Sequence, residues 1–480
     1  MQVNYNDIIN NEYKLSPNNY LKVSINSNSY HQLRELVDSV DKGVEIGSNN
    51  YVEESEFKFI RTAAISSDKY SIIVDDNSVL DVNPKSFVNF NLKLDDILIC
   101  KDSNVGEVVK LNKDLPNYMF SSGINRLNIN ENKDYIFGIM KNHKFKEQLV
   151  SMIPKGATLM HAKDLYLNCI IPYPTENSLI DYISSLVRII SNKENELENK
   201  MNMINEIIDS EILGNQKDNN YEYSYPKIAN IMNINRLDTG IYTKEFCDID
   251  NKLKNYYNGF FYLSKNNVKG GQTPKKRVIE ENEKLKYNWI TPTYINDDGT
   301  LNLNYRINCE KNNINKNCAL IINRTSKGGF GEYVGICSFY DYERFGPAQH
   351  NQGIYRVFNM NDRDLIYITC LLNSRLYRKY CANTSMGSKM KELKLSNILD
   401  IPFPKFSDEK KNQISNYYYN KCQKNGCVAE NDFESVNKEW DKNAGVIDLF
   451  ESIRSAKKYL NYVIDNIYEN QTVDKIYKVF

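Results

Sequence analysis

The chain has 480 residues, of which 41% are hydrophobic and 12% aromatic, so it is long and apolar enough for roughly two to four globular domains. Lysine and arginine together number 61 and equal the 61 aspartates and glutamates, which excludes a uniformly basic coat and confines any nucleic-acid surface to a local patch. The polar N-terminus, the lack of an apolar run of about 18 residues, and ten cysteines without a C-x-x-C pair predict a cytoplasmic protein with reduced thiols, no membrane segment and no structural metal.

Three short motifs occur twice along the chain, each time 230 positions apart. The pairs are Ile60-Arg61-Thr62 (with Ile65) and Ile290-Thr291-Pro292 (with Ile295), Gly123–Leu127 and Gly353–Val357, and Ile171–Pro174 and Ile401–Pro404. Between them, with small insertions, Asp96–Ile99 and Val105–Val108 resemble Ala319–Ile322 and Gly331–Val334. Each of these sets predicts a strand, a polar turn with glycine and a returning strand. The sequence therefore contains two copies of one plan.

Each copy is predicted to be rich in strands and then to have a short helical stretch. A glycine-containing turn follows (Gly156–Thr158; Gly387–Lys389), and then a strand that ends in Ile-Pro-aromatic-Pro. After the last proline we expect a helix, which begins at Thr175 in the first copy and near Ser407 in the second.

The stretch from Thr175 to Leu213 is predicted to be one long helix that ends at Gly214. Its apolar residues recur at steps of three and four and form a narrow seam of Leu179, Ile183, Leu186, Ile190, Leu197, Met201, Ile204 and Ile208. Such a seam predicts one partner helix, and flanking charges such as Lys193, Glu194 and Lys200 predict that the other faces lie in water. With about 39 residues at about 1.5 Å each, the helix is roughly 58 Å long, which is typical of a spacer.

A second heptad helix is predicted near the C-terminus. Its seam consists of Val446, Leu449, Ile453, Ala456, Leu460, Val463 and Ile467. We expect the two helices to pair antiparallel, with the polar segment Lys421–Ala444 as an irregular link before the second one. The alternative, in which each helix packs on its own neighbouring domain, stays open.

The order of globe, long helix, globe and helix resembles the DNA-specificity subunits of type I restriction-modification systems. So does the order of four motifs: GGQTPKK (Gly270–Lys276), WITPTYI (Trp289–Ile295), INRTSKGGFGEYVGI (Ile322–Ile336) and GSKMKELKLSNILDIPFP (Gly387–Pro404). The first copy departs from this pattern, with KGVEIGS at Lys42–Ser48 where the second has KGGQTPK.

The resemblance implies an α+β fold with two pseudo-twofold-related, strand-rich target-recognition domains, separated by a long antiparallel two-helix coiled coil. The expected boundaries are 1–174 for the first such domain, 175–214 for the central spacer helix, 215–406 for the second domain, and 407–480 for a C-terminal helical region that pairs with the central helix. Each domain would read half of a split site in double-stranded DNA. The helix pair would act as a ruler and as the docking platform for two methyltransferase (modification) subunits, and a restriction or translocase subunit stays open as a further partner.

Reading a base sequence requires side chains that pair with base edges. Such residues stand in the loops where the two copies diverge: Lys101, Asn104, Ser121 and Ser122 in the first, and Arg324, Thr325, Ser326, Lys327, Gln349, His350 and Asn351 in the second. The DNA-binding set also includes Thr62, Thr291 and Ser388. Phosphate contacts are expected from Arg61, Arg126, Arg356, Lys389 and Lys391.

Plainer explanations of these residues stay open. Arg126 and Arg356 recur at equivalent places, as structural salt bridges would. The segment Gly387–Lys389 fits a simple turn, and His350 fits an ordinary surface loop. The run Tyr417–Tyr419 is predicted to pack a helix on its globe rather than to stack on bases.

Catalysis has little support in the sequence. An amino-methyltransferase would need an N-P-P-Y or D-P-P-Y tetrapeptide, and neither occurs. Gly328–Gly331 is followed by the alternating segment Glu332–Phe339, which predicts a hairpin rather than a dinucleotide-binding loop. We therefore predict a non-catalytic subunit without a cofactor. Two alternatives remain, namely a coiled-coil scaffold with no nucleic-acid role, which the neutral net charge favours, and a self-contained DNA modification enzyme with an unfamiliar site.

Overall fold

The computed structural model describes residues 26–75, 77–153, 161–234, 236–281, 284–325, 333–387, 390–424 and 426–480. The chain divides into two units. Unit 1 consists of Met1–Leu197, Gln423–Asn443 and Leu449–Phe480, and unit 2 consists of Glu198–Cys422 and Ala444–Asp448. Within the described ranges, no helix is long and apolar enough to span a membrane.

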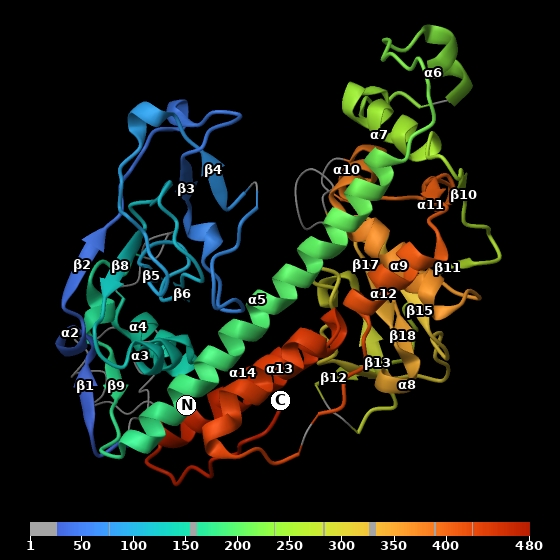
Figure 1. The fold of residues 1–480 in the computed structure, drawn as a ribbon. Coiled ribbons are helices and arrows are strands. Elements are labelled where there is room, and N and C mark those ends of the chain that lie inside the picture. Colours follow the sequence, from blue (N-terminus) through green and yellow to red (C-terminus); the bar gives the residue numbers. More distant parts are fainter. Residues whose placement is uncertain are drawn as a thin grey trace. The chain divides into compact units, whose positions relative to one another are not determined.

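The strands of unit 1 form a four-stranded sheet in the order β2-β8-β5-β6, a three-stranded sheet in the order β4-β3-β7, and the pair β1-β9 (Figure 1). Their bounds are β1 (Tyr30–Gln32), β2 (Ser39–Lys42), β3 (Lys58–Ile60), β4 (Val79–Asp81), β5 (Ile97–Cys100), β6 (Val108–Lys110), β7 (Tyr118–Phe120), β8 (Ile124–Asn128) and β9 (Ile170–Pro172). The helices that accompany them are α2 (Leu33–Leu36), α3 (Lys133–Lys141) and α4 (His143–Met152). Strand β3 runs parallel to β7, and the other paired strands of these sheets are antiparallel.

Unit 2 has corresponding sheets, namely β11-β19-β15-β17, β12-β14-β13-β18 and β10-β21, with a further pair β16-β20. Its second sheet has four strands, whereas that of unit 1 has three. The strand bounds are β10 (Phe260–Phe261), β11 (Val268–Gly270), β12 (Val278–Glu280), β13 (Tyr287–Ile290), β14 (Arg306–Asn308), β15 (Cys318–Ile322), β16 (Arg324–Thr325), β17 (Cys337–Tyr340), β18 (Ala348–His350), β19 (Ile354–Val357), β20 (Lys391–Glu392) and β21 (Phe403–Pro404). The helix bounds are α6 (Ile228–Ile234), α7 (Lys244–Lys254), α8 (Tyr342–Phe345), α9 (Asp362–Asn373), α10 (Arg375–Thr384), α11 (Leu395–Leu399) and α12 (Asp408–Tyr418).

The predicted internal repeat is confirmed at the level of strand register. In unit 1, Ile60 of β3 pairs with Phe120 of the parallel strand β7. In unit 2, Ile290 of β13 pairs with His350 of the parallel strand β18. Both strands of the second pair lie 230 positions beyond those of the first, so the matched motifs occupy equivalent places in two copies of one α+β topology.

Both predicted returning strands are wrong in their positions. In unit 1 the strand that returns beside β5 is β6 (Val108–Lys110), whereas Val105–Val108 was expected to form it. The strand that returns beside β15 is β17 (Cys337–Tyr340), whereas Gly331–Val334 was expected to form it. Tyr333 and Val334 instead lie in a turn, and residues 331 and 332 are outside the described ranges. The error in unit 2 arose because Glu332–Phe339 alternates in character over a longer stretch than the strand occupies.

In each unit the Ile-Pro-aromatic-Pro motif accepts a hydrogen bond from a buried tyrosine, but the accepting prolines differ by two positions within the motif. Tyr135 in α3 donates a hydrogen bond of 2.5 Å to the carbonyl of Pro172, and Tyr367 in α9 donates one of 2.6 Å to the carbonyl of Pro404. Pro172 is the first proline of its motif, whereas Pro404 is the second. Each unit thus has a buried tyrosine that ties its first long helix to the strand that closes the unit.

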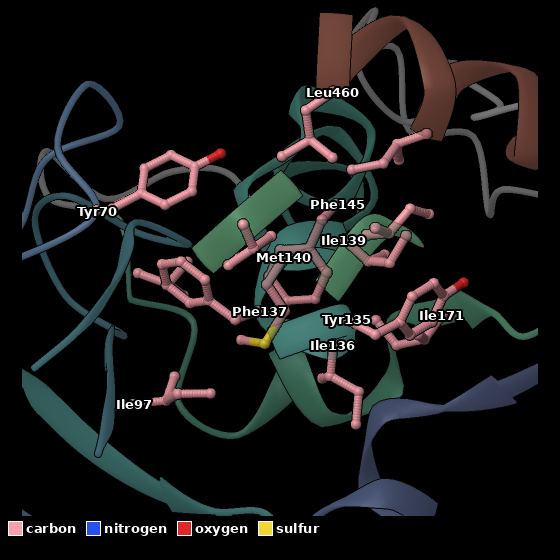
Figure 2. Close-up of a cluster of buried hydrophobic side chains, with 14 of the residues drawn as sticks. Tyr70, Ile97, Tyr135, Ile136, Phe137, Ile139, Met140, Phe145, Ile171 and Leu460 are labelled. Carbon is pink, nitrogen blue, oxygen red and sulfur yellow. The ribbon is translucent and has the colours of Figure 1, made fainter. Parts of the chain in front are cut away.

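The core of unit 1 joins the sheet to the helices. Residues of α3 and α4, including Phe137 and Phe145, form one buried cluster with Ile97 of β5 and with Leu460 near the C-terminus (Figure 2). Gly138 permits α3 to approach the long helix, because a Cβ atom there would lie 2.8 Å from Cγ2 of Val187. The first half of the long helix therefore belongs to the core of unit 1.

The long helix is α5 (Asn177–Gly214), and the predicted second heptad helix is α14 (Val446–Tyr468) (Figure 1). The seam of α14 is buried throughout. Their antiparallel pairing is confirmed within unit 1. Lys457, in the middle of α14, forms an ion pair with Glu194 of α5. Tyr468, the last residue of α14, donates a hydrogen bond to the carbonyl of Ile170, which precedes α5. Beyond Leu197, α5 belongs to unit 2, where Glu211 accepts a 2.8 Å hydrogen bond from Tyr256.

The prediction that α5 has one narrow seam, with its charged residues in water, is wrong in unit 1. Lys193 and Glu194 are at most 7% exposed, and apolar residues off the seam such as Val187 are also buried. Lys200, in the unit 2 part of α5, is 5% exposed. Lys193 is buried against a second partner helix, α13 (Phe433–Asn443), which lies in the segment predicted to be irregular. Glu194 accepts the backbone N–H of Tyr70 and pairs with Lys457.

Helix α13 runs beside α5 in the same direction. Arg188 pairs with Glu434 at 2.7 Å, and Lys193 pairs with Asp441 at 2.5 Å. Its apolar face is short and its remaining residues are polar, which explains why the sequence pattern did not reveal it. The link of the expected two-helix coiled coil is therefore a third helix.

Candidate nucleic-acid interface

In unit 1, the ends of three strands and the start of a fourth meet at one edge of the two sheets. Ser121, after β7, donates its backbone N–H to the carbonyl of Ile60 in β3 at 3.0 Å. Lys101, after β5, donates its N–H to the carbonyl of Gly123, just before β8, at 2.9 Å. A Cβ atom on Gly43 would lie 2.0 Å from the carbonyl oxygen of Ser121, so only glycine fits there.

Unit 2 has the same junction. Asn323 donates its N–H to the carbonyl of Gly353 at 2.9 Å. A Cβ atom on Gly271 would lie 2.0 Å from the carbonyl oxygen of Asn351, and one on Gly353 would lie 2.8 Å from Pro292. We call these places the glycine junctions, formed by Gly43, Thr62, Ser121 and Gly123 in unit 1 and by Gly271, Pro292, Asn351 and Gly353 in unit 2.

The unit 1 candidates lie at or beside this junction. Arg61 is exposed and donates to the backbone of Asn77 at 3.2 Å, while Lys101, Ser121 and Ser122 are half-buried. Thr62 is also half-buried, and Asn104, although exposed, donates from its side chain to the carbonyl of Thr62 at 3.1 Å. The structure brings all six of these residues to one edge.

In unit 2 the candidates separate into exposed and buried groups. Thr291, Asn351, Arg324 and Lys391 lie near the junction and are partly accessible. Thr325 pairs through its backbone with Lys391, and Ser326, Lys327, Ser388 and Lys389 lie outside the described residues. The predicted turn Gly156–Thr158 lies outside them as well.

Gln349 and His350 belong to β18 and are buried, with exposed fractions of 4% and 1%. Gln349 donates to the carbonyl of Gln272 at 2.6 Å, and burial, together with the charge of Arg356, lowers the pKa of His350 to about 3. His350 is therefore neutral near pH 7. Its counterpart in unit 1 is Phe120, which is also buried, so this strand position belongs to the core in both units.

The two repeated arginines are held by the protein itself. Arg126 contacts Asp41 at 2.6 Å and Asp96 at 3.1 Å, and it donates to the carbonyl of Phe90 at 3.0 Å. Arg356 is 9% exposed, and its guanidinium lies 4.5 Å from the ring centroid of Phe358. Arg126 therefore forms the salt bridges of the structural alternative, whereas the contacts of Arg356 are the carbonyl of Asn313 and the ring of Phe358.

Sequence reasoning missed residues that follow β11 in unit 2. Gln272 donates its N–H to the carbonyl of His350 at 3.0 Å, and the Thr273 hydroxyl donates to the side chain of Gln352, which places this segment at the glycine junction. Lys275, Lys276 and Arg277 follow directly and are exposed. The GGQTPKK motif was the available signal, although it served only to support a resemblance.

Each junction also carries a hydrogen-bonded pair of side chains, one of them acidic, at one equivalent position. The Ala162 N–H donates to the carbonyl of Lys101 at 2.7 Å, and Asp102 pairs with His161 at 2.7 Å. In unit 2, the Leu393 N–H donates to the carbonyl of Asn323 at 2.8 Å, and Arg324 pairs with Glu392 at 2.7 Å.

No cluster of three or more histidine, cysteine or acidic side chains within the described ranges is placed to hold a metal ion. No protein-family model matches the sequence, and no curated protein matches it either.

Solved structures similar to this chain include the S subunit of a type I restriction-modification system from M. genitalium, with 14% identity, 96% of this chain and 100% of that chain covered, and a TM-score of 0.42. A structure described for complex assembly and conformational transition of the type I system has 11% identity, coverage of 93% and 98%, and a TM-score of 0.30. The HsdS subunit from Thermoanaerobacter tengcongensis has 11% identity, coverage of 92% and 97%, and a TM-score of 0.29.

Proposed function

We propose that this chain is a non-catalytic DNA-recognition subunit of a type I-like restriction-modification or methyltransferase complex, and that it reads a bipartite site in double-stranded DNA. The observation that carries this proposal is the glycine junction, which occurs twice with one backbone and two sets of side chains. A reader of an asymmetric split site needs this combination. One frame docks on the duplex in the same way twice, while different side chains select different bases.

The charges around the junctions support this function despite the neutral net charge. Arg61 is exposed at the junction of unit 1, and Lys275, Lys276 and Arg277 are exposed beside that of unit 2. Exposed cations of this kind bind phosphates and supply affinity that depends on salt but not on sequence. The polar residues Ser121 and Asn351, at equivalent places, would then be positioned by the shared backbone to reach base edges.

The positions of these side chains reduce the set of residues that we propose as DNA contacts. We keep Arg61, Thr62, Lys101, Asn104, Ser121, Ser122, Thr291, Arg324, Asn351 and Lys391, and we add Gln272 and Thr273. Gln349 and His350 are buried and would reach DNA only if β18 repacked, and Arg126 and Arg356 serve the frame.

The remaining parts of the chain would position partners. We keep residues 1–174 and 215–406 as target-recognition domains, 175–214 as the spacer helix and 407–480 as the C-terminal helical region. Two methyltransferase subunits would dock on the solvent-facing sides of the helices, and they would flip a base out of the duplex to modify it. A restriction or translocase subunit stays open as a further member of this complex, which would act in the cytoplasm.

Two measurements test this function. The tagged chain is purified from its own host with whatever subunits accompany it, and the complex selects sequences from a randomised duplex library. In parallel, the methylome of the host is sequenced with and without the gene. We expect recovery of a methyltransferase, enrichment of two short sequences at a fixed spacing, and loss of methylation at that same site upon deletion.

The alternatives give different results. A coiled-coil scaffold would enrich no DNA sequence and leave the methylome unchanged. A self-contained modification enzyme would methylate DNA without any accompanying subunit. Either result overturns the proposed function.

A further inference from the structure

The hydrogen-bonded pairs Asp102–His161 and Arg324–Glu392, beside the two junctions, occupy one position of the shared frame. Asp102 and Arg324 each donate a backbone N–H, at 3.4 Å, to the carbonyl of the junction glycine, Gly123 or Gly353. Asp102 forms a β-bridge to His161, and Arg324 pairs with Glu392 in the same antiparallel sense. The two backbones therefore present these side chains in the same way.

The order of acidic and basic residues is reversed between the two pairs. In unit 1 the residue that follows the sheet strand is the acid, and its partner is the histidine. In unit 2 the residue that follows the strand is the base, and its partner is the acid. The side chains of Asp102 and Arg324 are 28% and 42% exposed, so both reach solvent.

This reversal determines what the position can contact. A phosphate contact requires a cation, and a carboxylate placed at the same spot would be repelled. A base edge offers either polarity, because arginine pairs with O6 and N7 of guanine whereas aspartate accepts from N4 of cytosine. A position that alternates in charge between two copies of one DNA-docking frame is therefore suited to base selection and not to backbone binding.

Resting on the proposed function, we propose that Asp102 and Arg324 are equivalent specificity-determining residues, and that they select cytosine in one half-site and guanine in the other. The partner residues position them. Glu392 holds Arg324 through one terminal nitrogen, and a guanidinium has donors enough for a bidentate contact besides. His161 holds Asp102 through Oδ1, and a carboxylate accepts further hydrogen bonds at its other oxygen.

The test transplants one pair into the other unit. The complex carrying D102R together with H161E in unit 1 selects sequences from the randomised duplex library, beside the parental complex and the single variants D102N and R324Q. The other bases of each half-site show which strand is being read, so that a selected cytosine on that strand can be distinguished from a guanine.

We expect the parental complex to require cytosine at one position of one half-site and guanine at one position of the other. D102N should relax the first choice about tenfold and R324Q the second, each without effect on the other half-site. The double exchange should change the first choice from cytosine to guanine.

Matched exchanges elsewhere control for the charge change itself. Lys93 and Asp114 form an exposed pair in unit 1, in the loops that precede β5 and β7 and so at the opposite edge of the sheets. Lys379 and Glu245 form another in unit 2. Exchanging the members of either pair should leave both half-sites as they are.

Unchanged selection by D102N and R324Q, with DNA binding retained, overturns the inference. So does a loss of all DNA binding in the double exchange when D102N selects as the parent does, because the position would then serve only the fold. If the parental complex enriches no sequence, the proposed function itself fails, which is a separate result.

Discussion

Lys193 in α5 and Asp441 in α13 form an ion pair with Nζ and Oδ1 2.5 Å apart, and their side chains are 0% and 4% exposed. The ring of Trp440 lies 4.7 Å from the same ammonium group. Burial lowers the pKa of Lys193, and the carboxylate of Asp441 opposes that shift. Charge and aromatic face together keep an ammonium group inside a helix interface that the heptad pattern would fill with an apolar residue.

Replacing Lys193 by methionine should destabilise unit 1 by about 3–5 kcal/mol, because it leaves the carboxylate of Asp441 buried beside an apolar side chain. The double variant K193M/D441L should recover most of that loss. Urea unfolding of the purified chain measures both. The exposed pair Lys442–Glu439 supplies the control, since K442M should change stability by about 0.5 kcal/mol or less. Equal effects of K193M and K442M would contradict the expectation.

His350 makes unit 2 sensitive to acid. Its pKa in the folded protein is about 3, below the ordinary value of 6.5, so the unfolded chain binds a proton first as the pH falls. The stability that this group contributes is complete above about pH 6.5 and is lost between pH 6.5 and pH 3, with a slope of up to about 1.4 kcal/mol per pH unit. Phenylalanine, the residue of the equivalent position Phe120, does not titrate.

Urea midpoints of the parental chain and of H350F, compared across this pH range, test the effect. We expect the difference between the two chains to move in favour of H350F as the pH falls. A difference that does not change with pH would show that His350 is not protonated on unfolding.

The glycine junctions should not tolerate a methyl group. Alanine at Gly43 or Gly271 would place Cβ 2.0 Å from a backbone carbonyl oxygen, so strands must move apart, which we expect to destabilise the affected unit by about 1–3 kcal/mol or more. Gly47 has no atom within 4 Å of its ideal Cβ and is the control. Thermal unfolding of G43A, G271A and G47A would refute this expectation if all three behaved alike.

The buried tyrosines Tyr135 and Tyr367 should contribute similar amounts to the free energy of unfolding of their units. Y135F and Y367F each remove a hydrogen bond to a proline carbonyl, which should reduce stability by about 1 kcal/mol in the unit concerned. Tyr462 is 58% exposed, and Y462F should have no measurable effect. Denaturant midpoints decide the matter, and a loss in only one of the two tyrosine variants would show that the repeat is not energetically symmetric.

Arg61 should contribute affinity for DNA without contributing sequence choice. R61Q should weaken binding of all duplexes alike and reduce the slope of log affinity against log salt by about one. Lys113 is exposed in the loop between β6 and β7, at the opposite edge of the sheets, so K113Q should leave that slope unchanged. Titrations at several salt concentrations give both values, and an equal change in the two variants would remove Arg61 from the interface.

The parts of the fold that sequence predicted well are those with a strong repeated signal. The motifs around Ile60 and Ile290 led to equivalent strands, and the seam of α14 is buried as its spacing predicted. Helix α13 escaped because it is short and mostly polar. Lys193 was placed in water because a charged side chain is seldom buried without a partner, and its partner Asp441 lies 248 positions away along the chain.

Some residues of the candidate site were also located correctly from the sequence, and others were not. Arg61 and Ser121 follow recognisable strands and lie at the junction, as a loop reading would suggest. His350 was read as a loop residue because Gln349 and Asn351 beside it are polar, yet two of the three belong to a buried strand. Strand alternation is uninformative where both faces are covered, so burial there could be learned only from tertiary structure.

Strands β1 and β9 pair antiparallel, and so do β10 and β21. In each unit the chain thus arrives and departs through neighbouring strands, which lie about 5 Å apart. The segment between these two strands includes the glycine junction and the side-chain pair beside it. Because the two strands pair with each other, the ends of this segment lie side by side. The segment between the paired strands can therefore change in length and chemistry without altering the distance that the flanking chain must span. Under the proposed function, base preference could then diversify while the helices that follow keep their register.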